Sequence, residues 1–133
     1  MAIDDLRKNG MMAHLLDALE RGKDIGHYGR LVFAMVARHF LEEPELIRLL
    51  TRGGGNFDEE HARALLLQVQ DRNYNPPRPD TIRQWQSRQE FPICPNIDDP
   101  DCCNVYKDLR FPEGIYDHIQ EYHEQKAEAR AQA

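Results

Sequence analysis

The sequence predicts a mostly α-helical fold, a compact bundle of five to six helices with a long irregular loop before the last one. Apolar residues recur every three to four positions in several stretches, and glycines and prolines interrupt them, which is typical of helices joined by turns. Residues 89–111 show no sustained period of either kind and carry every cysteine. At 133 residues the chain can bury a core as one domain without disulfides.

The first two helices are predicted from periodicity. Residues 11–22 form the first, because methionines and leucines recur at helical spacing and Gly22 follows as a C-terminal stop. Residues 26–41 form the second, with one apolar stripe facing the core and Arg30 and Arg38 able to leave it. We expect this second helix to be the central one.

The next two helices are predicted from their boundaries. Pro44 suits the first turn of a third, shorter helix, which the glycines of residues 53–55 end. Asp58 is the expected N-cap of a fourth helix, whose first turn is acidic and whose buried side consists of leucine and valine. Both elements follow from local sequence alone.

The second half of the chain is less regular. Three prolines within residues 74–79 predict an extended connector, and residues 81–88 fit one or two helical turns. Prolines and aspartates in residues 89–111 favour turns. A last helix is expected over residues 112–122, because a proline opens it and apolar residues recur along it. A loop of this length needs a function or a ligand to explain it.

Domain organisation and location follow from composition. We expect an N-terminal arm over residues 1–10, one helical domain over 11–123 and a polar tail over 124–133. The longest apolar runs, such as Leu31–Ala37, are too short to span a bilayer, and the first residues lack the apolar run of a secretory signal. A cytoplasmic protein without membrane contact is therefore expected. The net charge of −6 restricts any nucleic-acid site to a local patch.

The cysteines of the irregular loop are the first candidates for chemistry. Cys94 is followed by the adjacent pair Cys102 and Cys103. Thiolates in this setting favour zinc or an iron–sulfur cluster, although neighbouring cysteines seldom bind one ion together and a fourth ligand would have to be a distant histidine. The alternative is that the thiols are simply buried apolar groups, with no cofactor bound.

A basic and aromatic segment is the second candidate. Its cations and rings are Arg72, Tyr74, Arg78, Arg83, Trp85 and Arg88. Cations that contact phosphates and flat rings that stack on bases are what a binder of single strands or junctions requires. The alternative is that Trp85 belongs to the core and that the arginines pair with surface carboxylates.

The start of the second helix, GHYGR, is the third candidate. His27 and Arg30 are three residues apart and therefore share a face near the positive end of the helix dipole. Amides, an imidazole and a guanidinium together fit a phosphate. A capped helix start with a surface arginine has the same sequence pattern, so both interpretations stay open.

Motifs for catalysis are missing from the sequence. There is no GxSxG, no HExxH and no phosphate loop ending in GK[ST], and the glycines of residues 53–55 lack the lysine that such a loop needs. We therefore expect a non-catalytic protein. An enzyme would require a metal at the cysteine loop with an open coordination position.

Taken in order, several segments resemble one known family. They are GMMAHLL, GHYGRLVFAMVARHFL, FDEEHARALLLQV, YNPPRP and FPICPN with DPDCC. Their order resembles the C-terminal domain of the large, non-catalytic subunit of archaeal and eukaryotic primases, over roughly residues 11–122. The resemblance implies a helical domain that binds a 4Fe–4S cluster through four cysteines and helps to bind the initiating nucleotide and the primer–template junction.

The resemblance also implies roles for single residues. His27 and Arg30 match the family's histidine and arginine, which contribute to nucleic-acid contact. Cys94 falls at the third cluster cysteine, and Cys102 or Cys103 at the fourth.

The other two ligand positions depart from the family pattern. Met11 stands near the place of the first cysteine and Pro79 near that of the second. Half of the ligand set is thus replaced, which favours a cluster-free relative whose core is closed by apolar groups.

Two functions fit the sequence. The first is a nucleic-acid-binding module for single-stranded DNA or RNA or a primer–template junction, acting as a non-catalytic accessory of priming or replication beside a catalytic primase- or polymerase-type protein. Its expected contacts are His27, Arg30, Arg72, Tyr74, Arg78, Arg83 and Trp85. The second is a cluster-free protein-interaction module in a replication or defence complex, which the acidic charge balance favours.

Overall fold

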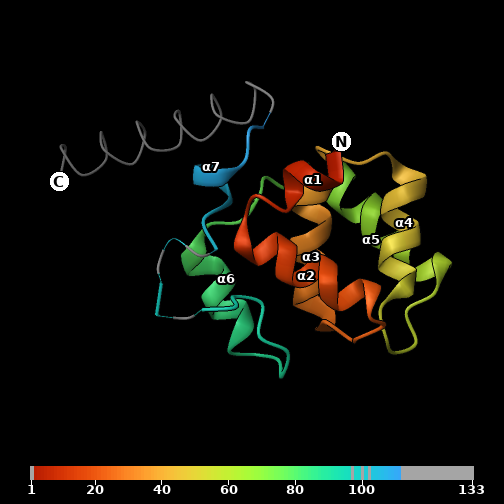
Figure 1. Cartoon of the computed structure of the whole chain (residues 1–133). Helices are drawn as coiled ribbons and strands as arrows, with labels where there is room; N and C mark the ends of the chain where they lie inside the picture. The colour runs from red at the N-terminus through yellow and green to blue at the C-terminus, as the bar shows by residue number, and fades with distance from the viewer. Residues whose placement is uncertain (1, 97, 100, 102, 112–133) are drawn as a thin grey trace, which may run out of the picture.

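A computed structural model describes residues 2–96, 98–99, 101 and 103–111. Over this part of the chain it contains seven α-helices and no strand, which confirms the mostly helical prediction (Figure 1). The helices are α1 (Ala2–Leu6), α2 (Gly10–Glu20), α3 (Gly26–Ala37), α4 (Glu43–Arg52), α5 (Glu59–Asp71), α6 (Pro79–Gln86) and α7 (Val105–Asp108). The helix expected over residues 112–122 and the tail at 124–133 lie outside the described residues. Among the described helices, none has the length and apolar character needed to cross a membrane.

Helix α3 is the centre of the bundle. It packs against α2, α4, α5 and α6, with α4 and α5 on one side of it and α6 on the other (Figure 1). Every residue from Gly29 to Ala37 is buried, so the helix is covered on all sides rather than along one stripe. The expectation that Arg30 leaves the core is therefore wrong, since its exposed fraction is only 7%.

Local signals define most helix ends as predicted. Helix α2 stops before Gly22, which adopts a positive φ of 73° that glycine tolerates without steric cost. Asp58 caps α5, because its Oδ1 accepts a hydrogen bond from the His61 N–H at 2.9 Å. Pro44 lies in the first turn of α4, where a missing N–H costs nothing.

The N-terminal segment differs from the arm that was expected over residues 1–10. Residues 2–6 form α1, and Leu6 is fully buried in the common core. Asn9 is also fully buried: its Oδ1 accepts the Met12 N–H at 3.0 Å and caps α2, while its Nδ2 donates to Asp108 Oδ2 at 3.0 Å. This side chain joins the beginning of the chain to α7.

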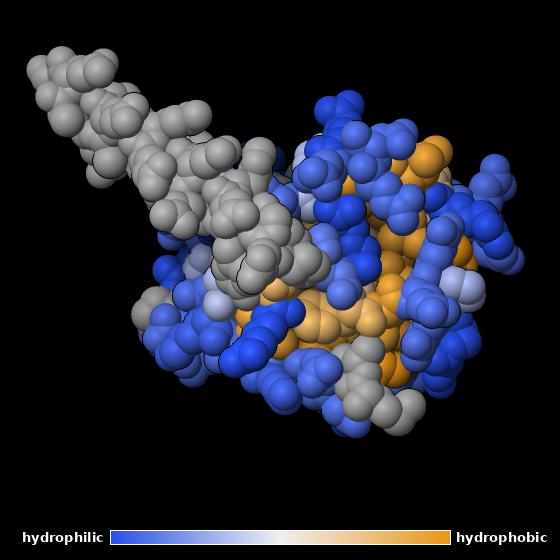
Figure 2. Space-filling view, turned by 90° about the horizontal axis from the view of Figure 1, so that it is seen from above, coloured by the Kyte–Doolittle hydropathy of each residue, from blue (hydrophilic) through white to orange (hydrophobic). Residues whose placement is uncertain are grey.

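The long irregular loop includes one short helix, α7, and it lies against the core. Ile93, Val105 and Leu109 are buried, so the loop contributes apolar groups at several points. The Cys94 N–H donates to Gln86 Oε1 at 2.6 Å, which ties the loop to the end of α6. Seen from above, the molecule shows apolar residues at its surface between hydrophilic ones (Figure 2).

Candidate ligand-binding pocket

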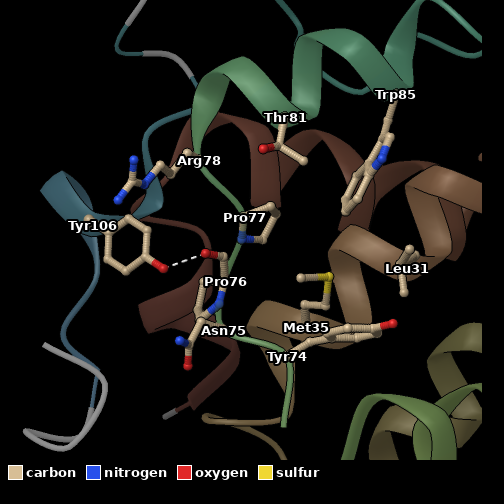
Figure 3. Close-up of a pocket in the computed structure, with 10 residues that line it drawn as sticks. All are labelled: Leu31, Met35, Tyr74, Asn75, Pro76, Pro77, Arg78, Thr81, Trp85 and Tyr106. Carbon is tan, nitrogen blue, oxygen red and sulfur yellow. Dashed lines mark hydrogen bonds between the residues drawn. The ribbon is translucent and has the colours of Figure 1, made fainter. Parts of the chain in front are cut away.

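A well-formed hollow lies between α3, α6 and the connector that joins α5 to α6. It is a cavity of about 570 Å³, within the range of about 300–1,000 Å³ that small-molecule sites occupy. Its lining residues are Leu31, Met35, Tyr74, Asn75, Pro76, Pro77, Arg78, Thr81, Trp85 and Tyr106. Figure 3 shows Trp85 and Thr81 reaching from α6 toward Leu31 and Met35 of α3, with Pro76 and Pro77 of the connector along one side.

The connector is fixed at both ends by side chains from other elements. The guanidinium of Arg38, at the end of α3, donates to the Tyr74 carbonyl at 3.0 Å and to Asn73 Oδ1 at 3.2 Å. Asn73 itself adopts a positive φ of 49°, which turns the chain out of α5. At the other end the Tyr106 hydroxyl donates to the Pro76 carbonyl (Figure 3). The extended wall of the pocket is therefore braced by tertiary hydrogen bonds.

Trp85 lies at the end of a run of rings. Its indole stacks on Tyr28, with ring centroids 5.6 Å apart and planes at 20°. Tyr28 in turn meets the exposed His27 ring edge-on at 5.2 Å. Because Tyr28 is not among the residues that line the cavity, it covers one side of Trp85 while the cavity borders another. The prediction that Trp85 points inward holds only in part, since it is half-buried.

The predicted arginines of the basic segment do not lie together. Arg78 lines the pocket, and Arg72 is exposed at the C-cap of α5. Arg83 is two positions from both Thr81 and Trp85, so it projects about 200° away from them around α6. Its Nε is buried, with no hydrogen-bond partner in the described part of the chain.

The start of α3, predicted as a phosphate site, is occupied by the protein's own carboxylate. Asp24 Oδ1 accepts a hydrogen bond from the Gly26 N–H at 2.9 Å and lies 2.9 Å from a terminal nitrogen of Arg30. The same nitrogen donates to the Gly54 carbonyl at 2.6 Å, and the guanidinium stacks over the Phe57 ring at 4.4 Å. The Gly26 amide and the Arg30 guanidinium thus contact an anion, but this anion is the carboxylate of Asp24 and not a bound phosphate.

A second side chain covers the same helix end. Gln89 Oε1 accepts the Tyr28 N–H at 3.0 Å, and its Nε2 donates to the carbonyls of Ile25 at 2.9 Å and Phe91 at 3.0 Å. Gln89 therefore caps α3 from a position more than sixty residues away. With Asp24 and Gln89 in place, Arg30 is a structural residue in this conformation, and only His27 of the predicted pair is exposed.

The cysteine loop places two of its thiols in the interior. Cys94 and Cys103 are buried, and Cys102 lies outside the described residues. The Cys94 thiol donates to the Asn96 carbonyl at 3.3 Å. Nowhere in the described ranges do three or more histidine, cysteine or acidic side chains gather as a metal site would require.

The structure also describes Met11 and Pro79, the two positions where the resemblance implies cluster cysteines. Met11 is fully buried in the core, and Pro79 is the first residue of α6. Neither position adds a ligand to the two buried thiols, and the described residues gather no group of three for zinc or an iron–sulfur cluster.

One titratable group lies beside the anchor of the pocket wall. The ring of His39 packs edge-on against Phe111, with centroids 5.7 Å apart, and its Nε2 is buried without a hydrogen-bond partner among the described residues. Burial, together with the neighbouring charge of Arg38, lowers the pKa of His39 to about 4. His39 is thus neutral at physiological pH.

Sequence reasoning found three of the pocket residues, Tyr74, Arg78 and Trp85, and missed the rest. Leu31 and Met35 were assigned to the core because they follow the helical stripe, and a cavity floor shows the same pattern. Tyr106 lies in a segment with no periodic signal at all.

Comparison with known proteins adds no assignment. No family model, curated protein or solved structure matches the chain. The primase resemblance therefore rests on the short sequence motifs alone.

Proposed function

We propose that this protein is a non-catalytic module that binds single-stranded nucleic acid, or the unpaired part of a primer–template junction, at the pocket between α3 and α6. In this proposal it acts in the cytoplasm as an accessory of a catalytic primase- or polymerase-type protein, in line with the primase resemblance. One observation carries the proposal: Tyr74, Arg78 and Trp85, predicted from sequence as contacts, line the same cavity.

The chemistry of this cavity supports the proposal. Aromatic faces stack on bases of any sequence, and an arginine beside them pairs with the backbone phosphate. Arg72 is exposed just before the connector, and His27 is exposed beyond the Tyr28–Trp85 stack, so a strand leaving the pocket has a basic and an aromatic group near it. The overall negative charge keeps the contact local.

Equilibrium binding of labelled oligonucleotides tests the function. A single strand and a primer–template with an overhang are titrated by fluorescence anisotropy at several salt concentrations. We expect binding that weakens as salt rises, because phosphate contacts release counterions. Replacing Arg72 and Arg78 together by alanine should weaken it further.

A matched double variant controls for net charge. Arg48 and Arg52 are exposed on α4, on the other side of α3 from α6, and their replacement by alanine removes the same two charges. This control should bind as the parent protein does. The proposal fails if no strand binds in a salt-sensitive manner, or if both double variants bind equally well.

The protein-interaction module remains a second candidate, because the floor and wall of the cavity are largely apolar. Leu31, Met35, Pro76 and Pro77 fit an apolar side chain of a partner as well as a base. A stable protein partner that co-purifies after nuclease treatment, resists high salt and is lost in Trp85→Ala would select this function.

A further inference from the structure

We propose, resting on the function above, that the pocket accepts one unpaired base of the strand, with its ring against Trp85 and Tyr74 and the adjoining phosphate at Arg78. The ligand class is then a single extruded or terminal nucleotide unit within a strand, not a base pair and not the sugar–phosphate backbone alone. This inference rests on how the described lining residues are arranged around the cavity.

The two ends of the cavity differ in character. Figure 3 shows Trp85, Tyr74 and the aliphatic side chains of α3 together on one side, while Arg78 and Tyr106 lie on the other. A ligand that fills the cavity therefore has an apolar, flat part and an anionic part. A nucleotide unit has both, whereas a bare phosphate or an alkyl chain has only one.

The rings are already arranged for stacking. Trp85 stands nearly parallel to Tyr28, so one side of the indole is held by an internal partner and its orientation is fixed before a ligand arrives. Another part of the indole borders the cavity. A base placed there extends a run of rings that starts at His27, which lies edge-on to Tyr28.

Polar groups inside the cavity suit the edge of a base. The amide of Asn75 and the hydroxyl of Thr81 are among the lining groups, and both side-chain types can donate and accept hydrogen bonds. In a duplex those edges are paired and both faces are stacked, so entry would require extrusion of the base. The pocket should therefore discriminate single strands from duplexes.

Trp85 is the single tryptophan of the chain, so its emission reports on the pocket directly. The protein is titrated with a short single strand, with the same strand made abasic throughout, and with the blunt duplex. We expect the base-containing strand to change the Trp85 emission and to bind roughly 5- to 150-fold more tightly than the abasic strand, the range reported for stacking of one base.

The outcomes separate this inference from the function on which it rests. Salt-sensitive binding that is equal for the normal and abasic strands, with no change in Trp85 emission, overturns base insertion and leaves strand binding in place. Equal affinity for the duplex also overturns it. If no oligonucleotide binds at all, the proposed function and this inference fail together.

A filled pocket provides a second test. Thr81→Phe places a larger side chain into the cavity from α6, and Ser87→Phe places the same side chain at the exposed C-cap of that helix. The first variant should reduce the difference between normal and abasic strands to less than about twofold, and the second should keep it. Urea unfolding of both variants verifies that each is folded.

Discussion

Arg30 and Arg78 each lie beside aromatic rings in segments that sequence patterns nominate for phosphate binding, yet their surroundings are opposite. At Arg30 the chain supplies the anion itself, because Asp24 lies against the guanidinium and Phe57 covers it. At Arg78 the chain leaves a cavity bordered by Tyr74 and Trp85. Residue type is shared by the two places, so what separates a structural arginine from a candidate binding arginine is whether a cavity lies beside it.

The strongest test of this contrast is Arg30→Ala. We expect a loss of about 2–3 kcal/mol in the free energy of unfolding, because hydrogen bonds to a charged group and a buried stack are removed together. The loss stays below the about 3–5 kcal/mol typical of fully buried pairs, since the Asp24 side chain is 56% exposed and water can solvate it. Urea unfolding measures the effect, with Arg48→Ala as an exposed control that should change little.

If Arg30→Ala left stability unchanged but reduced affinity for oligonucleotides, the internal pairing would not hold in solution. The start of α3 would then return as the phosphate site that its sequence pattern indicates. In that case Arg30, and not only Arg78, would be a candidate phosphate contact.

The next largest loss of stability is expected at Gly54, whose carbonyl accepts the hydrogen bond from Arg30. A Cβ at this position would lie 2.6 Å from the Gly22 carbonyl oxygen and 3.0 Å from the Asp24 N–H nitrogen, and both are backbone atoms that cannot move aside independently. Gly54→Ala should therefore cost about 1–3 kcal/mol of stability, as overpacking commonly does. Chemical denaturation measures this cost, and a neutral variant would mean that Gly54 does not approach the turn between α2 and α3 so closely.

Substitutions at the cavity should change the affinity for nucleic acid more than the free energy of unfolding. Arg78→Ala is expected to change the free energy of unfolding by about 1 kcal/mol or less, as half-exposed positions commonly do. It should also lower the salt dependence of strand binding by about one phosphate contact. Anisotropy titrations at several salt concentrations provide the slope, and an unchanged slope would remove Arg78 from the interface.

The last test concerns pH and the pocket wall. The pKa of His39 falls to about 4 in the folded protein against 6.5 in the unfolded chain, so the unfolded state binds more protons between these values. Stability should therefore fall as pH drops from about 6.5 toward 4 and change no further from this group below that. In His39→Gln the part of the slope due to this group should vanish in urea titrations across that range, while a slope identical to that of the parent protein would assign the pH effect to other groups.

Sequence patterns predicted what is decided locally. The caps at Asp58 and Gly22 depend on a few neighbouring residues, and both were found where expected. The burial of Arg30 was not predictable, because its guanidinium donates to a carbonyl 24 positions away that comes near only in the folded chain. The cap that Gln89 provides on α3 is equally non-local.

The pocket was predictable only in part, for the same physical reason. Tyr74, Arg78 and Trp85 carry chemistry that a reader of the sequence can recognise, whereas Leu31 and Met35 look like any other core residues of an amphipathic helix. Whether an apolar side chain meets another one or an empty volume depends on how helices pack, which periodicity does not encode.

The hydrogen bond from Asn9 to Asp108 connects positions 99 residues apart, and this has a consequence for the order of folding. Bringing such distant segments together carries the largest loop-closure entropy of any contact described, so we expect it to form after the central helices have assembled. Because Asn9 is the N-cap of α2, this bond joins α7 to the start of α2, and α7 would then be the last helix to dock and the first to detach. Since α7 also holds Tyr106 on the pocket wall, hydrogen exchange should be faster in α7 than in the central helices, and the completeness of the pocket should follow the docking of α7 onto the start of α2.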